Sequence, residues 1–199
     1  MELASGFIHL IINKQLTVYG SDLSIGAMAT ITSICLMFLM PVYGLSQAMQ
    51  IIVAYNYGSK SHNRARQAFI QANVIAIVML TIGFILIRVY PIEFISIFTN
   101  DKNLINIALE GLKIYSMSLP IVGISILSTV YFQSINKTKL SIVMGLLRQV
   151  IFLIPIIILI PRMYNLDGIW MSQPLADIFS MITIIVIVIK SSKLRENKQ

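Results

Sequence analysis

The chain has 199 residues, of which 57% are hydrophobic and only 12% are charged, and its net charge is +7. Soluble domains average about 45–50% apolar and about 25% charged residues, so the composition excludes a soluble globular protein and indicates a membrane protein. The basic residues sit at the ends of apolar segments rather than on one polar face, which favours membrane topology over nucleic-acid binding as the reason for the charge.

Six apolar segments follow one another along the chain, and most are long enough to cross a bilayer, which takes roughly 20 residues in a helix. The first is the short one. The segments are residues 3–18, 23–55, 68–90, 105–132, 140–160 and 169–189. We therefore expect an all-α, polytopic membrane helix bundle of about six transmembrane helices.

The second segment ends at Gly58 and is followed by a short polar loop with three basic residues, Lys60, Arg64 and Arg66. Lysine and arginine in short loops are retained on the cytoplasmic side of a membrane. With this loop inside, nine Lys and Arg residues lie at inner ends of the segments and four at outer ends. Both termini are therefore predicted to be cytoplasmic.

Polar side chains on the second segment have two interpretations. Gln47 and Gln50 can line a polar cavity or join neighbouring helices by hydrogen bonds. Tyr43 can stack on a flat organic cation or belong to an interfacial belt of aromatic residues. The single cysteine, Cys35, cannot form an intramolecular disulfide and is expected to fill space between helices.

Residues 91–103 contain an apolar cluster followed by a polar turn, which predicts a short interfacial helix. Asn100 or Asp101 in that turn can cap the next helix. Pro120 then interrupts the fourth apolar segment, because proline has no N–H and clashes with the preceding turn.

Asp177 and Arg148 are charged residues inside predicted spans, where charges are expensive and become candidates for function. Asp177 follows Pro174 by three residues, so its carboxylate can bind a proton or Na⁺ near a freed backbone carbonyl, or neutralise a cationic substrate. The alternative is a carboxylate satisfied by a neighbouring helix or by water. Arg148 lies nine residues beyond Lys139, roughly 13 Å along a helix, so it can snorkel to the interface or pair with an acidic residue.

Signatures of enzymes and of bound cofactors are missing from the sequence. It contains no GxSxG, HExxH, Walker loop, CxxC or dinucleotide fingerprint. His9 and His62 have no second ligand at metal spacing. We therefore predict that the protein is not an enzyme, that it needs no cofactor or metal, and that an ion gradient supplies the energy for any transport.

The order of several motifs resembles a known family. Gly44 and Gln47, the tract from Ala54 to Lys60, and Arg64 with Arg66 resemble the end of the second helix in the C-terminal lobe of multidrug and toxic compound extrusion (MATE) transporters. The resemblance continues through the motifs Arg148-Gln149 with Pro155 downstream, and Gly168-Ile169-Trp170 with Pro174 and Ala176-Asp177. It covers nearly the whole chain but only one of the family's two six-helix lobes, and Met1 falls inside the first helix of that lobe.

The resemblance implies multidrug efflux, in which H⁺ or Na⁺ antiport expels organic, often cationic compounds across the cytoplasmic membrane. Residues 1–190 would form the C-terminal lobe, and residues 191–199 would form a basic cytoplasmic tail. The partners of the lobe would be an N-terminal lobe, small organic substrates and the lipid bilayer, but no nucleic acid. Some branches of the family carry a carboxylate at the place of Glu2, which makes Glu2 a second candidate; the alternative is an exposed N-terminal residue.

Two other functional classes remain open from the sequence. A flippase for lipid-linked oligosaccharides from the same superfamily would share the helix count but would need a more basic cavity to bind pyrophosphate. A non-transporting fragment, or a subunit that assembles with a separate N-terminal half, is the other alternative.

Overall fold

The computed structural model describes the backbone of residues 2–196 and the side chains of residues 6–186, and this part of the chain is helical, with short turns between the helices. The elements in order are α1 (Glu2–Tyr19), α2 (Asp22–Gly58), α3 (His62–Val89), α4 (Pro91–Ser96), α5 (Lys102–Tyr115), η1 (Ser116–Ser118), α6 (Leu119–Ser134), α7 (Thr138–Leu146), η2 (Leu147–Leu153), α8 (Ile154–Leu159) and α9 (Pro161–Glu196).

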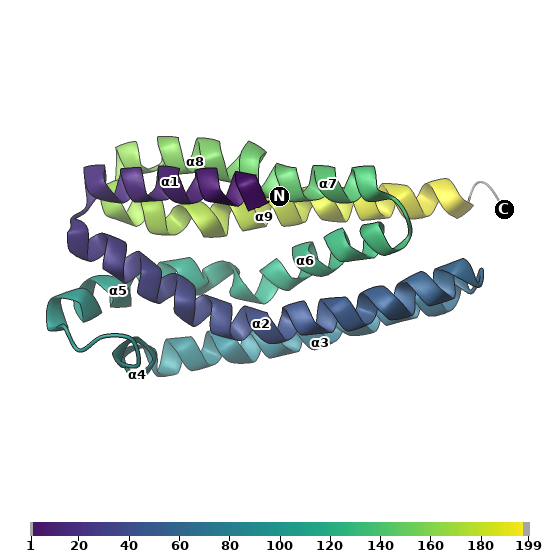
Figure 1. Cartoon of the computed structure of the whole chain (residues 1–199), viewed down its shortest axis with the longest axis horizontal. Helices are drawn as coiled ribbons and strands as arrows, with labels where there is room; N and C mark the ends of the chain where they lie inside the picture. Colours follow the sequence, from purple (N-terminus) through teal and green to yellow (C-terminus); the bar gives the residue numbers. More distant parts are fainter. Residues whose placement is uncertain (1, 197–199) are drawn as a thin grey trace.

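The helices form an elongated bundle with two sides (Figure 1). Helices α1, α7, α8 and α9 lie together along one side, and α2 and α3 lie along the other. The α5–α6 segment runs between them, with α5 against α2 and α9, and α6 against α2, α3, α7 and α9. The α5–α6 segment therefore contacts both sides of the bundle.

The predicted all-α membrane bundle is confirmed. Within the described residues, five helical segments are long and apolar enough to cross a membrane: Asp22–Gly58, His62–Val89, Lys102–Ser134, Thr138–Leu159 and Pro161–Val186. The short first apolar segment also forms a helix, α1, with 18 residues, but it is not among these five. Helix α9 continues beyond the predicted span and through most of the predicted tail, to Glu196.

The polar connection after α3 contains the short helix predicted there, α4. Asp101 is the N-cap of α5, and its side chain accepts a hydrogen bond of 2.8 Å from the backbone N–H of Asn103. An N-cap of this kind satisfies one of the free N–H groups of the first turn. One of the two capping residues proposed from the sequence therefore has this role.

Two of the spans are interrupted at their middle. The 3₁₀-helix η1 separates α5 from α6, and Pro120 follows it in the first turn of α6, as the sequence predicted. The π-helix η2 separates α7 from α8 and was not predicted. Pro155 explains its position, because a proline without an N–H leaves the carbonyl four residues upstream without its α-helical donor, and a wider turn can accommodate this.

Close helix contacts hold the interrupted spans in place. Gly111 on α5 faces α2 and α9 so closely that an added Cβ would lie 2.6 Å from Cδ1 of Ile31 and 2.9 Å from Cε2 of Trp170. Trp170 is fully buried. Small residues allow helix backbones to approach in this way, and the approach fixes the position of η1, five residues further along the chain.

Candidate functional site

Asp177 on α9 stands out from the other buried polar residues. Among the side chains that the structure describes, eleven polar residues are buried, and nine of them are serines. Asp177 is the one that carries a charge, and it is only 2% exposed. Since burying an isolated carboxylate is very costly, its surroundings must supply hydrogen bonds and a compensating charge.

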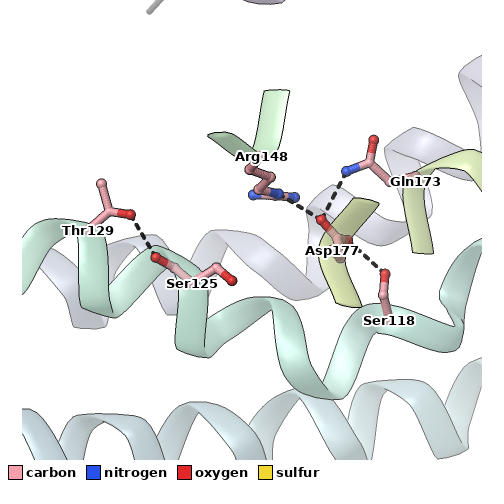
Figure 2. A network of polar contacts seen from close by, with 6 residues as sticks. All are labelled: Ser118, Ser125, Thr129, Arg148, Gln173 and Asp177. Atoms are coloured by element: carbon pink, nitrogen blue, oxygen red, sulfur yellow. Dashed lines mark hydrogen bonds and ion pairs between the residues drawn. The ribbon is translucent and has the colours of Figure 1, made fainter. Parts of the chain in front are cut away.

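Three side chains donate hydrogen bonds to this carboxylate (Figure 2). Nε of Arg148 lies 2.7 Å from Oδ1 and forms an ion pair with it. Nε2 of Gln173 donates to the same oxygen at 3.2 Å. Oγ of Ser118 donates to Oδ2 at 2.8 Å. The ion pair balances the charge, and the two neutral donors stabilise the ionised carboxylate further.

The two interrupted spans and helix α9 all contribute to this site. Ser118 is the last residue of η1, Arg148 lies in η2, and Asp177 follows Pro174 by three residues. Irregular backbone within a membrane is tolerated where it is buried in protein or lines a cavity, and π-turns occur frequently at functional sites. The local structure therefore places two of the partners, Ser118 and Arg148, where the helices depart from regular geometry.

Two cavities of about 200 Å³ each meet at Arg148, which lines both. We call the first the Asp177 cavity; its polar lining includes Thr32, Tyr115, Ser118, Gln173 and Asp177. We call the second the Ser180 cavity; its polar lining includes Tyr43, Ser46, Ser125, Thr129 and Ser180. On each of α2, α6 and α9, the residues that line the Ser180 cavity come later in the chain than those that line the Asp177 cavity. On α2 they are therefore closer to the α2–α3 turn. The two cavities are therefore offset along the length of the bundle.

The six candidates from the sequence lie in different places. Arg148 and Asp177 come together as the ion pair, and Tyr43, 38% exposed, lines the Ser180 cavity. Gln47 is exposed and Gln50 is half-buried, and neither is among the residues that line the two cavities. The side chain of Glu2 lies outside the described residues.

Sequence reasoning missed Ser118, Gln173 and Ser180, although each had a signal. Gln173 precedes Asp177 by four residues, the spacing at which a glutamine and an aspartate meet on one helix face. Ser180 follows Asp177 by three residues and so shares that face. Ser118 lies two residues before Pro120, at a predicted helix break.

A multidentate metal site is not found in the part of the chain that the structure describes, where no three His, Cys, Asp or Glu side chains cluster. The chemistry of the site is therefore that of one carboxylate, paired with Arg148, in a small cavity with a mixed polar and apolar lining. Such a group can bind a proton, a small cation or a positively charged group of an organic molecule.

Comparisons with known proteins identify relatives of this chain. The MatE family model matches residues 2–159. The multidrug export protein MepA of Staphylococcus aureus (strain bovine RF122 / ET3-1) is 26% identical over 194 residues, and MepA of Staphylococcus saprophyticus shares the same identity. Each alignment covers 94% of this chain and 41% of the relative, so the chain spans about two fifths of the length of these relatives.

Solved structures agree with this match. The MATE multidrug transporter DinF-BH, solved in complex with R6G, superimposes with a TM-score of 0.81 and 30% identity, over 94% of this chain and 42% of that one. An outward-facing multidrug resistance MATE family transporter of the MOP superfamily superimposes with a TM-score of 0.90 at 14% identity, over 98% of this chain and 44% of that one. At that low identity, the second match shows the fold alone.

Proposed function

The chain belongs to the MATE family, and from that premise we propose that it forms one lobe of a two-lobe transporter that exports organic, often cationic compounds across the cytoplasmic membrane. The names of the relatives support the activity, and the two-fifths coverage supports the single lobe. In carriers built from two related halves, one half rocks against the other around a central site. This lobe would form one wall of that site.

The observation that carries the proposal is the buried carboxylate of Asp177 beside its cavity. A single carboxylate can be neutralised by one partner at a time: a proton, Na⁺ or the cationic group of a substrate. Mutual exclusion at such a group couples the export of one cation to the import of another, which is antiport. We propose H⁺ or Na⁺ as the coupling ion, with Asp177 as the point of exchange.

The charge of the site supports this substrate class over lipid-linked sugars. In the two described cavities, the one arginine is already paired with the one aspartate, so they present no excess positive charge for a pyrophosphate. A carboxylate whose positive partner can be replaced is suited to bind a cation instead.

We also propose that the basic α2–α3 turn is cytoplasmic, because lysine and arginine in short loops are retained on the cytoplasmic side. The Ser180 cavity, which is closer to this turn, would then lie toward the cytoplasm.

Ethidium efflux from energised cells tests the proposal. The chain is expressed alone, and also together with the N-terminal half of a MATE relative. We expect efflux only when both halves are present, and a loss of efflux in the Asp177→Asn variant. The matched control is Asp167→Asn, the same substitution on the same helix at an exposed residue, which should leave efflux unchanged. No efflux in any combination, despite confirmed membrane insertion, would contradict the proposed transport.

A further inference from the structure

Three hydrogen bonds already occupy most of the roughly four acceptor positions of the Asp177 carboxylate. Oδ1 already accepts hydrogen bonds from Arg148 and Gln173, and Oδ2 accepts one from Ser118. An arriving cation would also meet the positive charge of Arg148, whose Nε lies 2.7 Å from Oδ1. Two positive groups cannot share one buried carboxylate at low cost, since the charges repel strongly in a low dielectric. If a cation is to bind, the guanidinium must leave.

The Ser180 cavity, on the other side of Arg148, offers hydrogen-bond acceptors. Thr129 donates its hydroxyl hydrogen to the carbonyl of Ser125 at 2.8 Å, and Ser46 donates its own to the carbonyl of Tyr43 at 2.7 Å. Because each hydroxyl has a single hydrogen to donate, both oxygens are left with lone pairs only. They can accept hydrogen bonds but not donate them.

Two further hydroxyls in this cavity lack a hydrogen-bond partner in the described structure. Oγ of Ser125 and Oγ of Ser180 are buried, and their residues are 3% and 0% exposed. A buried hydroxyl without a partner carries a desolvation cost, so a donor that entered the cavity would be stabilised there. With about 200 Å³, the cavity is several times the roughly 30 Å³ occupied by a water molecule in the liquid.

A guanidinium group has the complementary chemistry, with five N–H donors and no acceptor. Arg148 already lines the Ser180 cavity, so its side chain can reach this second position by rotation about its own bonds. We propose that Arg148 is a tethered counter-cation: it pairs with Asp177 while no other cation does, and its guanidinium moves into the Ser180 cavity when a cationic group binds Asp177. This inference rests on the proposed function, since it assigns the group that the transported cation displaces.

The exchange explains how a carboxylate that is already ion-paired can still bind cations. Neither end state leaves a buried charge alone, because Asp177 exchanges one positive partner for another, and the guanidinium exchanges the carboxylate for hydroxyl oxygens. Arg148 is thus a positioning residue that competes with the cation. A purely structural pair makes the opposite prediction, because losing Arg148 would then only disturb the site.

Equilibrium binding of ethidium separates the two roles. The 199-residue chain is purified into lipid nanodiscs, and ethidium binding is measured by fluorescence polarisation in alkaline buffer, where carboxylates are ionised. We expect Arg148→Gln to lower the Kd for ethidium about fivefold or more, because the tethered competitor is gone. An unchanged or higher Kd in a variant with wild-type helicity would overturn the proposal.

A second pair of variants tests the receiving cavity and does not depend on the folding of Arg148→Gln. The double substitution Ser125→Ala/Ser180→Ala removes the two unpartnered hydroxyls, so the displaced guanidinium loses acceptors and the Kd for ethidium should rise several-fold. The control is Ser128→Ala, which removes a hydroxyl that is also buried and unpartnered in the described structure but lines neither cavity. Equal effects of the double variant and the control would contradict the exchange.

The wild-type chain and Asp177→Asn distinguish failure of this inference from failure of the proposed function. If Asp177→Asn weakens ethidium binding but Arg148→Gln does not tighten it, the exchange alone is overturned. If Asp177→Asn leaves binding unchanged, Asp177 is not the cation site, and both the proposed role of this carboxylate and the exchange are wrong.

Discussion

The ion pair between Arg148 and Asp177 makes a quantitative prediction for stability. Removing one partner of a buried ion pair costs about 3–5 kcal/mol, because it leaves a buried charge uncompensated. Asp177 is 2% exposed, so Arg148→Gln should cost about 3 kcal/mol even with Ser118 and Gln173 still donating to the carboxylate. The side chain of Arg148 is 24% exposed and can reach water, so Asp177→Asn should cost less, roughly 2 kcal/mol.

The double variant Arg148→Gln/Asp177→Asn completes the cycle. Because it removes both charges together, its cost should fall below the sum of the single costs by roughly 1–3 kcal/mol. The single tryptophan, Trp170, is fully buried and reports unfolding by its fluorescence as SDS is added to detergent-solubilised protein. Strictly additive costs, or a larger cost for Asp177→Asn than for Arg148→Gln, would refute this account of the pair.

Three further substitutions test the backbone and the hydrogen bonds around the site. Pro155→Ala restores an N–H and should shorten the π-helix, which rotates Arg148 and lowers ethidium efflux at unchanged expression. Gly168→Ala should destabilise the protein by about 1–3 kcal/mol in the SDS titration, because the added Cβ would lie 2.8 Å from the backbone carbonyl of Ile160. Its control is Gly44→Ala, where no atom lies within 4 Å of the added Cβ. Ser118→Ala removes a donor to the buried carboxylate and should cost about 1.5–3 kcal/mol, as hydrogen bonds to charged groups do.

The sequence predicted those features that depend on local chemistry. Runs of apolar residues located most of the helices to within a few residues, because only a helix satisfies its own backbone in a bilayer, but α3 begins six residues before its predicted span and α9 extends beyond its span at both ends. Pro120 predicted the break before α6, and Asp101 was one of two residues proposed as the cap of α5. The cost of charge in hydrocarbon singled out Arg148 and Asp177 before their contact was visible.

Features that depend on packing between helices were not predicted. Arg148 and Asp177 are 29 residues apart on different spans, so their pairing follows from how η2 faces α9. Arg148 lies in the π-helix, whose wider turn changes the direction of the side chain. A prediction that assumes a regular α-helix cannot include that change. Gln47 and Gln50 have the polarity of cavity residues, but their positions on α2 do not bring them to either cavity.

Transport driven by an imposed ion gradient tests the central claim most directly. The chain is reconstituted with an N-terminal MATE half in proteoliposomes, and ethidium transport is recorded under a proton gradient and, separately, under a sodium gradient. We expect one of the two gradients to drive transport in the wild-type chain and in Asp167→Asn, and neither to drive it in Asp177→Asn. Gradient-driven transport at wild-type rates in Asp177→Asn would contradict the assignment of this carboxylate as the point where ion and substrate exchange.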